Sequence, residues 1–165
     1  MKPKAATPSK PTATDATAAT QAVGRFCNGC NCSQSVLVAY AGRYGLDESM
    51  AMRIAVGLGG GVGRMGGTCG TLSGAALVLG LEFGPGQAGD KAAKDLTYAA
   101  AGELQRRFME KHGSNQCRDL LNYDLSIDEE YHEARAAGVF KTHCPNYVET
   151  AVSLLDEIID EYRKP

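Results

Sequence analysis

Four of the six cysteines in this chain stand where the sequence predicts that a helix begins. These helix-start cysteines are Cys32, Cys69, Cys117 and Cys144. Each follows an Asn, Thr or Ser within a few residues, and these are the residue types that cap helix N-termini. A helix N-terminus carries about +0.5 of a charge and unpaired N–H donors, so a thiol there is expected to ionise more readily. Because the thiolate is the form that ligates metals or does redox chemistry, we expect the four to converge on one site.

The other two thiols, Cys27 and Cys30, form a C-x-x-C pair just before Cys32. A C-x-x-C followed by histidine would attach a c-type haem, but Asn31 occupies that position, so covalent haem is not expected. The spacing brings two sulfurs close enough for a disulfide or a shared metal. A redox-active dithiol, alternative metal ligands and incidental thiols of a flexible segment all stay open for this pair.

A glycine-rich stretch, residues 57–70, leads into Cys69. Gly61, Gly63 and Gly66 match the G-x-G-x-x-G dinucleotide fingerprint, but that motif needs a parallel strand–helix–strand unit, which the sequence does not predict here. A phosphate-binding loop would need lysine at the position of Gly67. We expect instead that the glycines let the backbone approach closely and turn N–H groups toward a sulfur site around Cys69. A plain connection between two helices is the alternative.

Other polar residues have both functional and purely structural interpretations. Arg64, inside the glycine-rich stretch, would offset the negative charge of a thiolate site, bind an anionic substrate, or simply be exposed. His143 next to Cys144 is either a metal ligand or a neighbour of the helix start. His112 precedes Gly113 at an expected helix end, where a cation suits the helix dipole.

The elements that would position these residues are helical from residue 31 onward, with no period-2 strand pattern. The predicted helices cover residues 31–44, 47–58, 69–81, 89–112, 117–121, 128–137 and 145–162. The helix at 69–81 is apolar nearly all round, so we expect it to be central. The predicted apolar faces comprise Met50, Ile54 and Leu58; Leu96, Ala99, Ala100, Leu104, Phe108 and Met109; and Val148, Val152, Leu155 and Ile159. Ser126 is the expected cap of the 128–137 helix.

The composition fits one all-α domain that needs no disulfides, because 165 residues with 44% hydrophobic side chains can bury a substantial core. Residues 1–25 are rich in Ala, Thr, Pro and Lys and are predicted to be a disordered tail, with the helical redox domain at 26–165. The acidic body argues against nucleic-acid binding. No apolar run reaches the ~18 residues of a membrane span, and no secretory signal is visible, so we expect a cytoplasmic protein without membrane insertion.

In combination, the motifs resemble those of the small redox-active proteins named for a C…GCAxxG…C…C signature. They also resemble the non-haem part of split-Soret cytochromes c, which contains an iron–sulfur centre. The resemblance covers about residues 26–162 and is carried by residues 31–37, 59–74 and 117–121 together with Cys144. It implies a helical redox protein whose helix-start cysteines Cys32, Cys69, Cys117 and Cys144 ligate a 2Fe-2S or 4Fe-4S cluster. The signature's Gly-Cys-Ala is Thr68-Cys69-Gly70 here, a small change that we do not expect to disturb the turn.

The resulting prediction is an electron-transfer protein, acting either as an electron carrier or as an oxidoreductase, with an iron–sulfur cluster as cofactor. Its electron-transfer partner is unidentified, and a homodimer that brings two centres together stays open. The alternative is a metal-free thiol–disulfide oxidoreductase or redox sensor that uses Cys27 and Cys30. A structural zinc site ranks last, unless Cys27 and Cys30 supply one of its ligand pairs, because zinc usually takes its cysteines in closely spaced pairs and the helix-start cysteines are isolated in sequence.

Overall fold

The computed structural model describes residues 17–164, which form helices joined by short loops and contain no β-strand. The predicted all-α fold is therefore confirmed for this part of the chain. The α-helices are α1 (Ala18–Cys27), α2 (Cys32–Ala41), α3 (Glu48–Ala55), α4 (Gly70–Phe83), α5 (Lys91–His112), α6 (Cys117–Leu121), α7 (Asp128–Ala136), α8 (Val139–Thr142) and α9 (Cys144–Tyr162). Two 3₁₀ turns, η1 (Gly42–Tyr44) and η2 (Val56–Leu58), extend α2 and α3.

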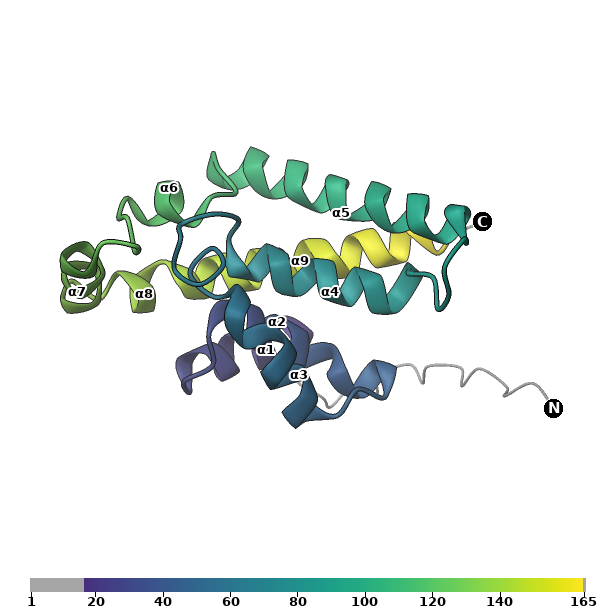
Figure 1. The fold of residues 1–165 in the computed structure, drawn as a ribbon, viewed down its shortest axis with the longest axis horizontal. Helices are drawn as coiled ribbons and strands as arrows, with labels where there is room; N and C mark the ends of the chain where they lie inside the picture. The colour runs from purple at the N-terminus through teal and green to yellow at the C-terminus, as the bar shows by residue number, and fades with distance from the viewer. Residues whose placement is uncertain (1–16, 165) are drawn as a thin grey trace.

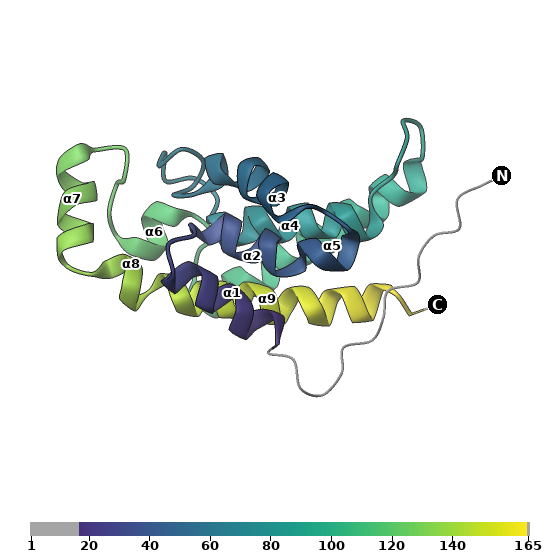
Figure 2. The ribbon, with the colours of Figure 1, turned by 90° about the horizontal axis from the view of Figure 1, so that it is seen from below.

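Two groups of helices pack against each other (Figures 1 and 2). The long helices α4, α5 and α9 lie side by side. The shorter α1 and α2 pack on α9 and α4, on the side away from α5, and α3 packs on α2. The helices α6, α7 and α8 lie at one end, beside the glycine-rich loop that precedes α4 (Figure 1). Every helix-start cysteine belongs to a helix that begins near this end, so the fold gathers the thiols there.

The central position predicted for α4 is confirmed, because Leu72, Val78 and Leu79 are fully buried. The helix packs closely on α2 because Gly74 faces the backbone of Ser33. A Cβ on Gly74 would lie only 2.7 Å from the Ser33 carbonyl oxygen. Absence of a side chain therefore sets the distance between α2 and α4, the helices that carry two of the candidate thiols.

The N-terminal prediction needs a correction, because Ala18–Cys27 form α1 inside and just beyond the predicted tail. The side chain of Thr17 caps this helix by accepting a hydrogen bond from Thr20 N. Ala22 is fully buried, and Phe26 packs on the same core. Small residues supply most of this contact, which is why the apolar pattern was too weak to predict it. Residues 1–16 lie outside the described part of the chain.

The predicted inner faces are partly wrong. Helix α3 buries Ala51 and Ala55, while Met50 and Ile54 are 46% and 48% exposed. Close packing on α2 favours the small side chains, so the bulky ones turn outward. In α5, the predicted core residues Ala100, Leu104 and Phe108 are buried, but Leu96, Ala99 and Met109 are exposed.

The last helix follows the prediction, because Val148, Val152, Leu155 and Ile159 are all buried. The predicted cap at Ser126 is wrong. Ile127 takes the N-cap position of α7, and the Ser126 hydroxyl bonds instead to Asp124 Oδ1 at 2.6 Å. Of the helices between residues 17 and 164, none has both the length and the apolarity that crossing a bilayer requires.

Candidate functional site

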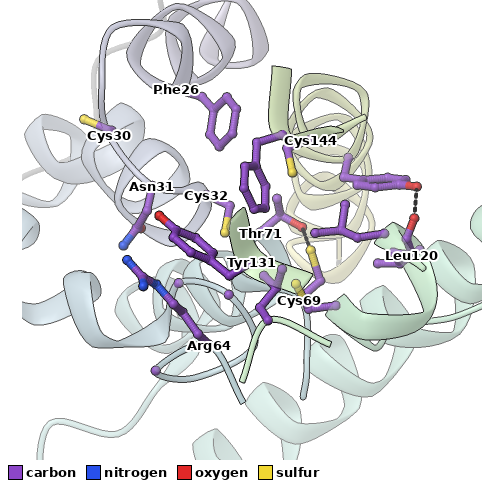
Figure 3. A pocket seen from close by; sticks show the side chains of 18 of the residues that line it. Phe26, Cys30, Asn31, Cys32, Arg64, Cys69, Thr71, Leu120, Tyr131 and Cys144 are labelled. Atoms are coloured by element: carbon purple, nitrogen blue, oxygen red, sulfur yellow. Dashed lines mark hydrogen bonds between the residues drawn. The ribbon is translucent and has the colours of Figure 1, made fainter. Parts of the chain in front are cut away.

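The four helix-start cysteines line a single cavity of about 890 Å³ at the end of the molecule where α6 and α8 lie. Figure 3 shows Cys32, Cys69 and Cys144 pointing toward the same space. Cys32, Cys117 and Cys144 are the first residues of α2, α6 and α9, and Cys69 is the N-cap of α4. The structure thus brings together thiols that are separated by up to 112 residues of sequence.

Cys32 is held by a capping box, whose local sequence signal is Asn31 followed three residues later by Gln34. The Asn31 side chain accepts a hydrogen bond from Gln34 N at 3.0 Å, and the Gln34 side chain accepts one from Asn31 N at 3.0 Å. The Asn31 amide also donates to the Val56 carbonyl at 2.8 Å, which ties the start of α2 to the end of α3. Such bonds satisfy N–H groups that would otherwise lack partners and fix the direction in which Cys32 points.

The sequence suggested that the glycine-rich loop would turn its N–H groups toward Cys69, but in the structure they approach Cys32. Backbone N–H groups of Gly60 and Gly70 hydrogen-bond to the Cys32 sulfur. Gly60 has a φ of +65°, which a residue with a side chain rarely adopts. A Cβ on Gly70 would come well inside van der Waals contact of Cys32 Sγ. Both glycines therefore allow backbone donors to approach the sulfur closely.

Cys69 and Cys117 are joined through the backbone. Cys69 N donates to the Asn115 carbonyl at 2.8 Å, and Cys117 N donates to the Gly67 carbonyl at 2.7 Å. Thr68 and Gln116 between them form an isolated antiparallel bridge. This clamp, formed by the backbones of residues 67–69 and 115–117, fixes the starts of α4 and α6 relative to each other. The side chain of Thr71, which sequence reasoning missed, lies 3.2 Å from the Cys69 sulfur.

Cys144 begins α9 beside a small aromatic group on the same side of the cavity. Tyr147, one turn along α9, lines the cavity and donates its hydroxyl hydrogen to the Leu120 carbonyl at 2.9 Å. Its ring meets those of Phe108 and His112, with centroids 6.1 Å and 4.9 Å away. Burial lowers the pKa of His112, and its Nε2 is buried without a partner among the described residues. The lowered pKa disfavours the cation that the sequence suggested for this helix end, because burial opposes ionisation of the imidazole.

All four thiols are less acidic than their helix-start positions suggest. Burial first, and then the negative charge of neighbouring cysteines, raises the pKa of Cys69 to about 11 and that of Cys117 to about 12. The pKa values of Cys32 and Cys144 are raised as well, chiefly by burial. Burial outweighs the helix N-terminus, so the metal-free thiols are protonated at pH 7. The mutual effects also show that the four sulfurs are electrostatic neighbours.

The remaining predicted residues lie at the edge of the site or outside it. Cys27 is exposed at the end of α1 and does not line the cavity. Cys30 does line it, but its sulfur points away from Cys32 (Figure 3) and lies 3.7 Å from Met52 Sδ. His143 is exposed and contacts the Thr142 hydroxyl at 2.8 Å rather than the cavity, so the structure offers it no ligand position.

The mouth of the cavity carries a contact that no local sequence signal indicates. The Arg64 guanidinium lies 3.9 Å from the centroid of the Tyr131 ring, which belongs to α7. Arg135, one turn further along α7, also lines the cavity. The glycine-rich loop and α7 therefore face each other across the mouth. Only the three-dimensional fold brings these segments together, since Arg64 and Tyr131 are 67 positions apart in the sequence.

The donor set fits an iron–sulfur cluster. The four helix-start cysteines and Cys30 line the cavity, and no carboxylate does; thiolates are the ligands that such clusters take in proteins. Across residues 17–164, no group of three or more His, Cys, Asp or Glu side chains is arranged to hold a single metal ion as it stands. A polynuclear cluster shares its ligands among several metal atoms, so the four thiols need not surround one point.

Comparison with known protein families identifies the family to which the sequence is similar. A family model described as "Putative redox-active protein (C_GCAxxG_C_C)" matches residues 30–158, which include all four helix-start cysteines. No curated protein and no solved structure matches the chain.

Proposed function

Because the chain belongs to the C_GCAxxG_C_C family of redox-active proteins, we propose that it binds an iron–sulfur cluster and transfers electrons. The four helix-start cysteines would be the ligands. The observation that carries this proposal is their convergence on one cavity from four separate helices. When bound, such a cluster would supply one-electron transfer between a donor and an acceptor.

The helix starts would favour a negatively charged group at this position. Helices α2, α4 and α9 have 10, 14 and 19 residues, and their N-termini all meet the cavity through a cysteine. Each such N-terminus contributes about +0.5 of a charge. An oxidised two-iron centre with four thiolates has a net charge of about −2, so the N-termini of these three helices would offset much of it.

Backbone N–H groups around the thiols would adjust the reduction potential. The Gly60 and Gly70 amides already face the Cys32 sulfur, and the Thr71 hydroxyl faces that of Cys69. Donors to sulfur stabilise the more negative, reduced state, so they raise the potential. The glycine-rich loop would also shield this side of the site from water.

The raised pKa values of the buried thiols favour metal binding over thiol–disulfide exchange as their role. Thiols with pKa values of about 11 and 12, such as Cys69 and Cys117, carry almost no thiolate at pH 7 and are poor nucleophiles. A metal centre supplies the positive charge that releases their protons. The buried set therefore suits ligation better than exchange, whereas the role of Cys27 and Cys30 stays a prediction.

Anaerobic purification followed by reconstitution with iron and sulfide tests the proposal. We expect iron and sulfide in equal amounts, absorption in the visible range and an EPR signal in one oxidation state. Replacing any helix-start cysteine by serine is expected to reduce the iron content strongly, since each removes one thiolate ligand.

The chain contains its own matched controls. Cys27→Ser and Cys30→Ser make the same chemical change at the exposed thiol and at the thiol that points away from Cys32 and toward Met52. Both variants are expected to keep their iron. A colourless protein with no iron after reconstitution would refute the proposal. Loss of iron in Cys27→Ser but not in Cys117→Ser would refute the ligand assignment.

A further inference from the structure

The cavity is larger than the thiol site alone requires. Its volume is about 890 Å³, within the range of about 300–1,000 Å³ found for small-molecule sites. An eight-atom cluster, at no more than the ~30 Å³ that a water molecule takes up per atom, would fill at most roughly 240 Å³. The buried cysteines Cys69 and Cys117 form the deep part, and exposed residues such as Arg64 border the opening. Space for a second group therefore lies between the thiols and the mouth.

The charged residues that line this space are both arginines. Arg64 and Arg135 line it, and none of the lining residues is an aspartate or glutamate. The chain as a whole has 19 acidic and 17 basic residues, so a surface that is solely cationic differs from the average. An anion entering the mouth would meet two positive charges and no carboxylate.

Neither arginine is engaged with a carboxylate of the protein. Six of the nine arginines form ion pairs within 4.0 Å, namely Arg25, Arg43, Arg106, Arg107, Arg118 and Arg163. Among residues 17–164, the three without such a pair are Arg53, Arg64 and Arg135. Two of these three line the cavity. Their donors are free for a ligand, and the planar guanidinium matches a carboxylate or phosphate through two parallel bonds.

Arg64 is held in place rather than left mobile in solvent. Its guanidinium lies on the Tyr131 ring, 3.9 Å from the centroid, which fixes the side chain over the mouth. Its backbone has a φ of +67°, a conformation that costs free energy for any residue with a Cβ. Loop hydrogen bonds maintain it, among them Arg64 N to the Gly59 carbonyl at 3.3 Å. Glycine would adopt this conformation without strain, so the strain is the cost of presenting an arginine here.

The second arginine borders the same part of the mouth. Tyr131 and Arg135 are four residues apart on α7, and such pairs lie on the same face of a helix. The ring that holds Arg64 therefore has Arg135 as its neighbour. Figure 3 shows Arg64 and Tyr131 together at the pocket that contains Cys32.

Much of the remaining wall is apolar, and several of its side chains are aromatic. Phe26, Tyr131 and Phe140 line it together with Leu120 and Leu125. A ligand that satisfies both parts of the surface has an apolar body and one acidic group. Fully hydrated inorganic anions would use the arginines but not this wall.

From these observations we infer that the cavity binds a small organic anion, a carboxylate or phosphate ester. Its acidic group pairs with Arg64 and Arg135, and its apolar body lies against the aromatic wall. The ligand then sits between solvent and the helix-start cysteines. The binding does not depend on the proposed function, although a role of the ligand as electron donor or acceptor would rest on it.

Calorimetric titration with benzoate, phenyl phosphate and the neutral benzamide tests this inference on both metal-free and iron-reconstituted protein at low salt. We expect benzoate or phenyl phosphate to bind at least about tenfold more tightly than benzamide, which corresponds to about 1.4 kcal/mol. Comparison of the two anions tells a carboxylate site from a phosphate site. Arg64→Gln and Arg135→Gln are each expected to weaken binding of the anion by about tenfold.

Arg53→Gln is the matched control, because Arg53 is an exposed arginine of α3 that lacks an ion pair and does not line the cavity. It is expected to leave the affinity unchanged. Far-UV circular dichroism and thermal unfolding show whether each variant is folded. Equal binding of benzamide and the anions, equal effects of Arg53→Gln and Arg64→Gln, or no binding of any probe at millimolar concentration overturns the inference.

The outcomes also distinguish this site from the proposed cluster. Arg64-dependent binding of benzoate in a protein that takes up no iron would reject the cluster and keep the anion site. A cluster that assembles normally while Arg64→Gln changes its potential but not the affinity for any anion would reject the anion site. In that case the two arginines serve only to offset the charge of the cluster.

Discussion

The contact between α2 and α4 leads to a prediction in which one substitution has opposite effects at two positions of the same helix. Gly74→Ala places a Cβ 2.7 Å from the Ser33 carbonyl oxygen and 3.1 Å from Val36 Cβ. Ordinary contacts begin at 3.4 Å, so the two helices must separate by about 0.7 Å locally. The obstacle is backbone, which cannot rotate away as a long side chain does.

The magnitude follows from two opposing effects. Overpacking of this kind costs about 1–3 kcal/mol, and a backbone obstacle favours the upper end of that range. The higher helix propensity of alanine offsets about 1 kcal/mol, which leaves a net loss of about 2 kcal/mol. For a domain of this size, 1 kcal/mol corresponds to about 2–4 °C, so we expect Tm to fall by about 4–8 °C.

Gly80→Ala is the matched control in the same helix. A Cβ there meets nothing within 4 Å, and the residue is exposed. Only the propensity effect applies, so we expect stabilisation by about 0.5–1 kcal/mol. Thermal unfolding by circular dichroism measures both variants. If Gly74→Ala were as stable as the unmodified protein, close packing of α2 on α4 would be refuted, and with it the geometry that places Cys32 beside Gly70.

Two further predictions concern residues away from the cavity. Burial opposes ionisation of Glu82, but hydrogen bonds from Arg163 and Tyr44 outweigh this effect and hold its pKa below the ordinary 4.5. The Glu82 carboxylate therefore stabilises the fold above pH 4.5, and this stabilisation is lost as the pH falls below 4.5. Glu82→Gln should flatten the decline of Tm between neutral and acidic pH, whereas the exposed Glu110→Gln should not; parallel curves for both variants would contradict this. The buried Tyr40 hydroxyl donates to Asp156 at 2.7 Å, so Tyr40→Phe should cost about 1–2 kcal/mol by urea unfolding, and the 64% exposed Tyr98→Phe almost nothing. Equal midpoints for these two variants would show that the bond contributes no stability.

Local signals in the sequence predicted where the candidate thiols lie. The Asn31–Gln34 capping box and Pro145 in the first turn of α9 act within one helical turn, so they can be read without knowing the fold. The starts of the four thiol-bearing helices are consequently close to the predicted positions. The buried face of α9 could also be predicted, because a helix that is buried along its whole length on one face has a strong periodicity of apolar residues in its sequence.

The features that the sequence did not reveal depend on partners distant in the chain. The clamp between Thr68 and Gln116 joins two loop segments that have no strand pattern of their own. The stacking of Arg64 on Tyr131 likewise depends on how α7 returns to the glycine-rich loop. The thiol acidity was misjudged for a related reason, because a helix N-terminus is visible in the sequence whereas burial is a property of the packed molecule.

At Gly70, a local sequence feature and a contact made only in the folded protein act together in the site. The family signature places alanine after the second cysteine, where this chain has Gly70. The sequence alone gives no reason to expect that this replacement of alanine by glycine affects the site. In the structure a Cβ at this position would collide with Cys32 Sγ and lie 3.0 Å from the Leu58 carbonyl oxygen. The Gly70 amide meanwhile donates to the same sulfur. The absent side chain therefore permits the approach of α2 that gives Cys32 one of its backbone donors, so the departure from the signature is part of how this chain brings its first two helix-start thiols together.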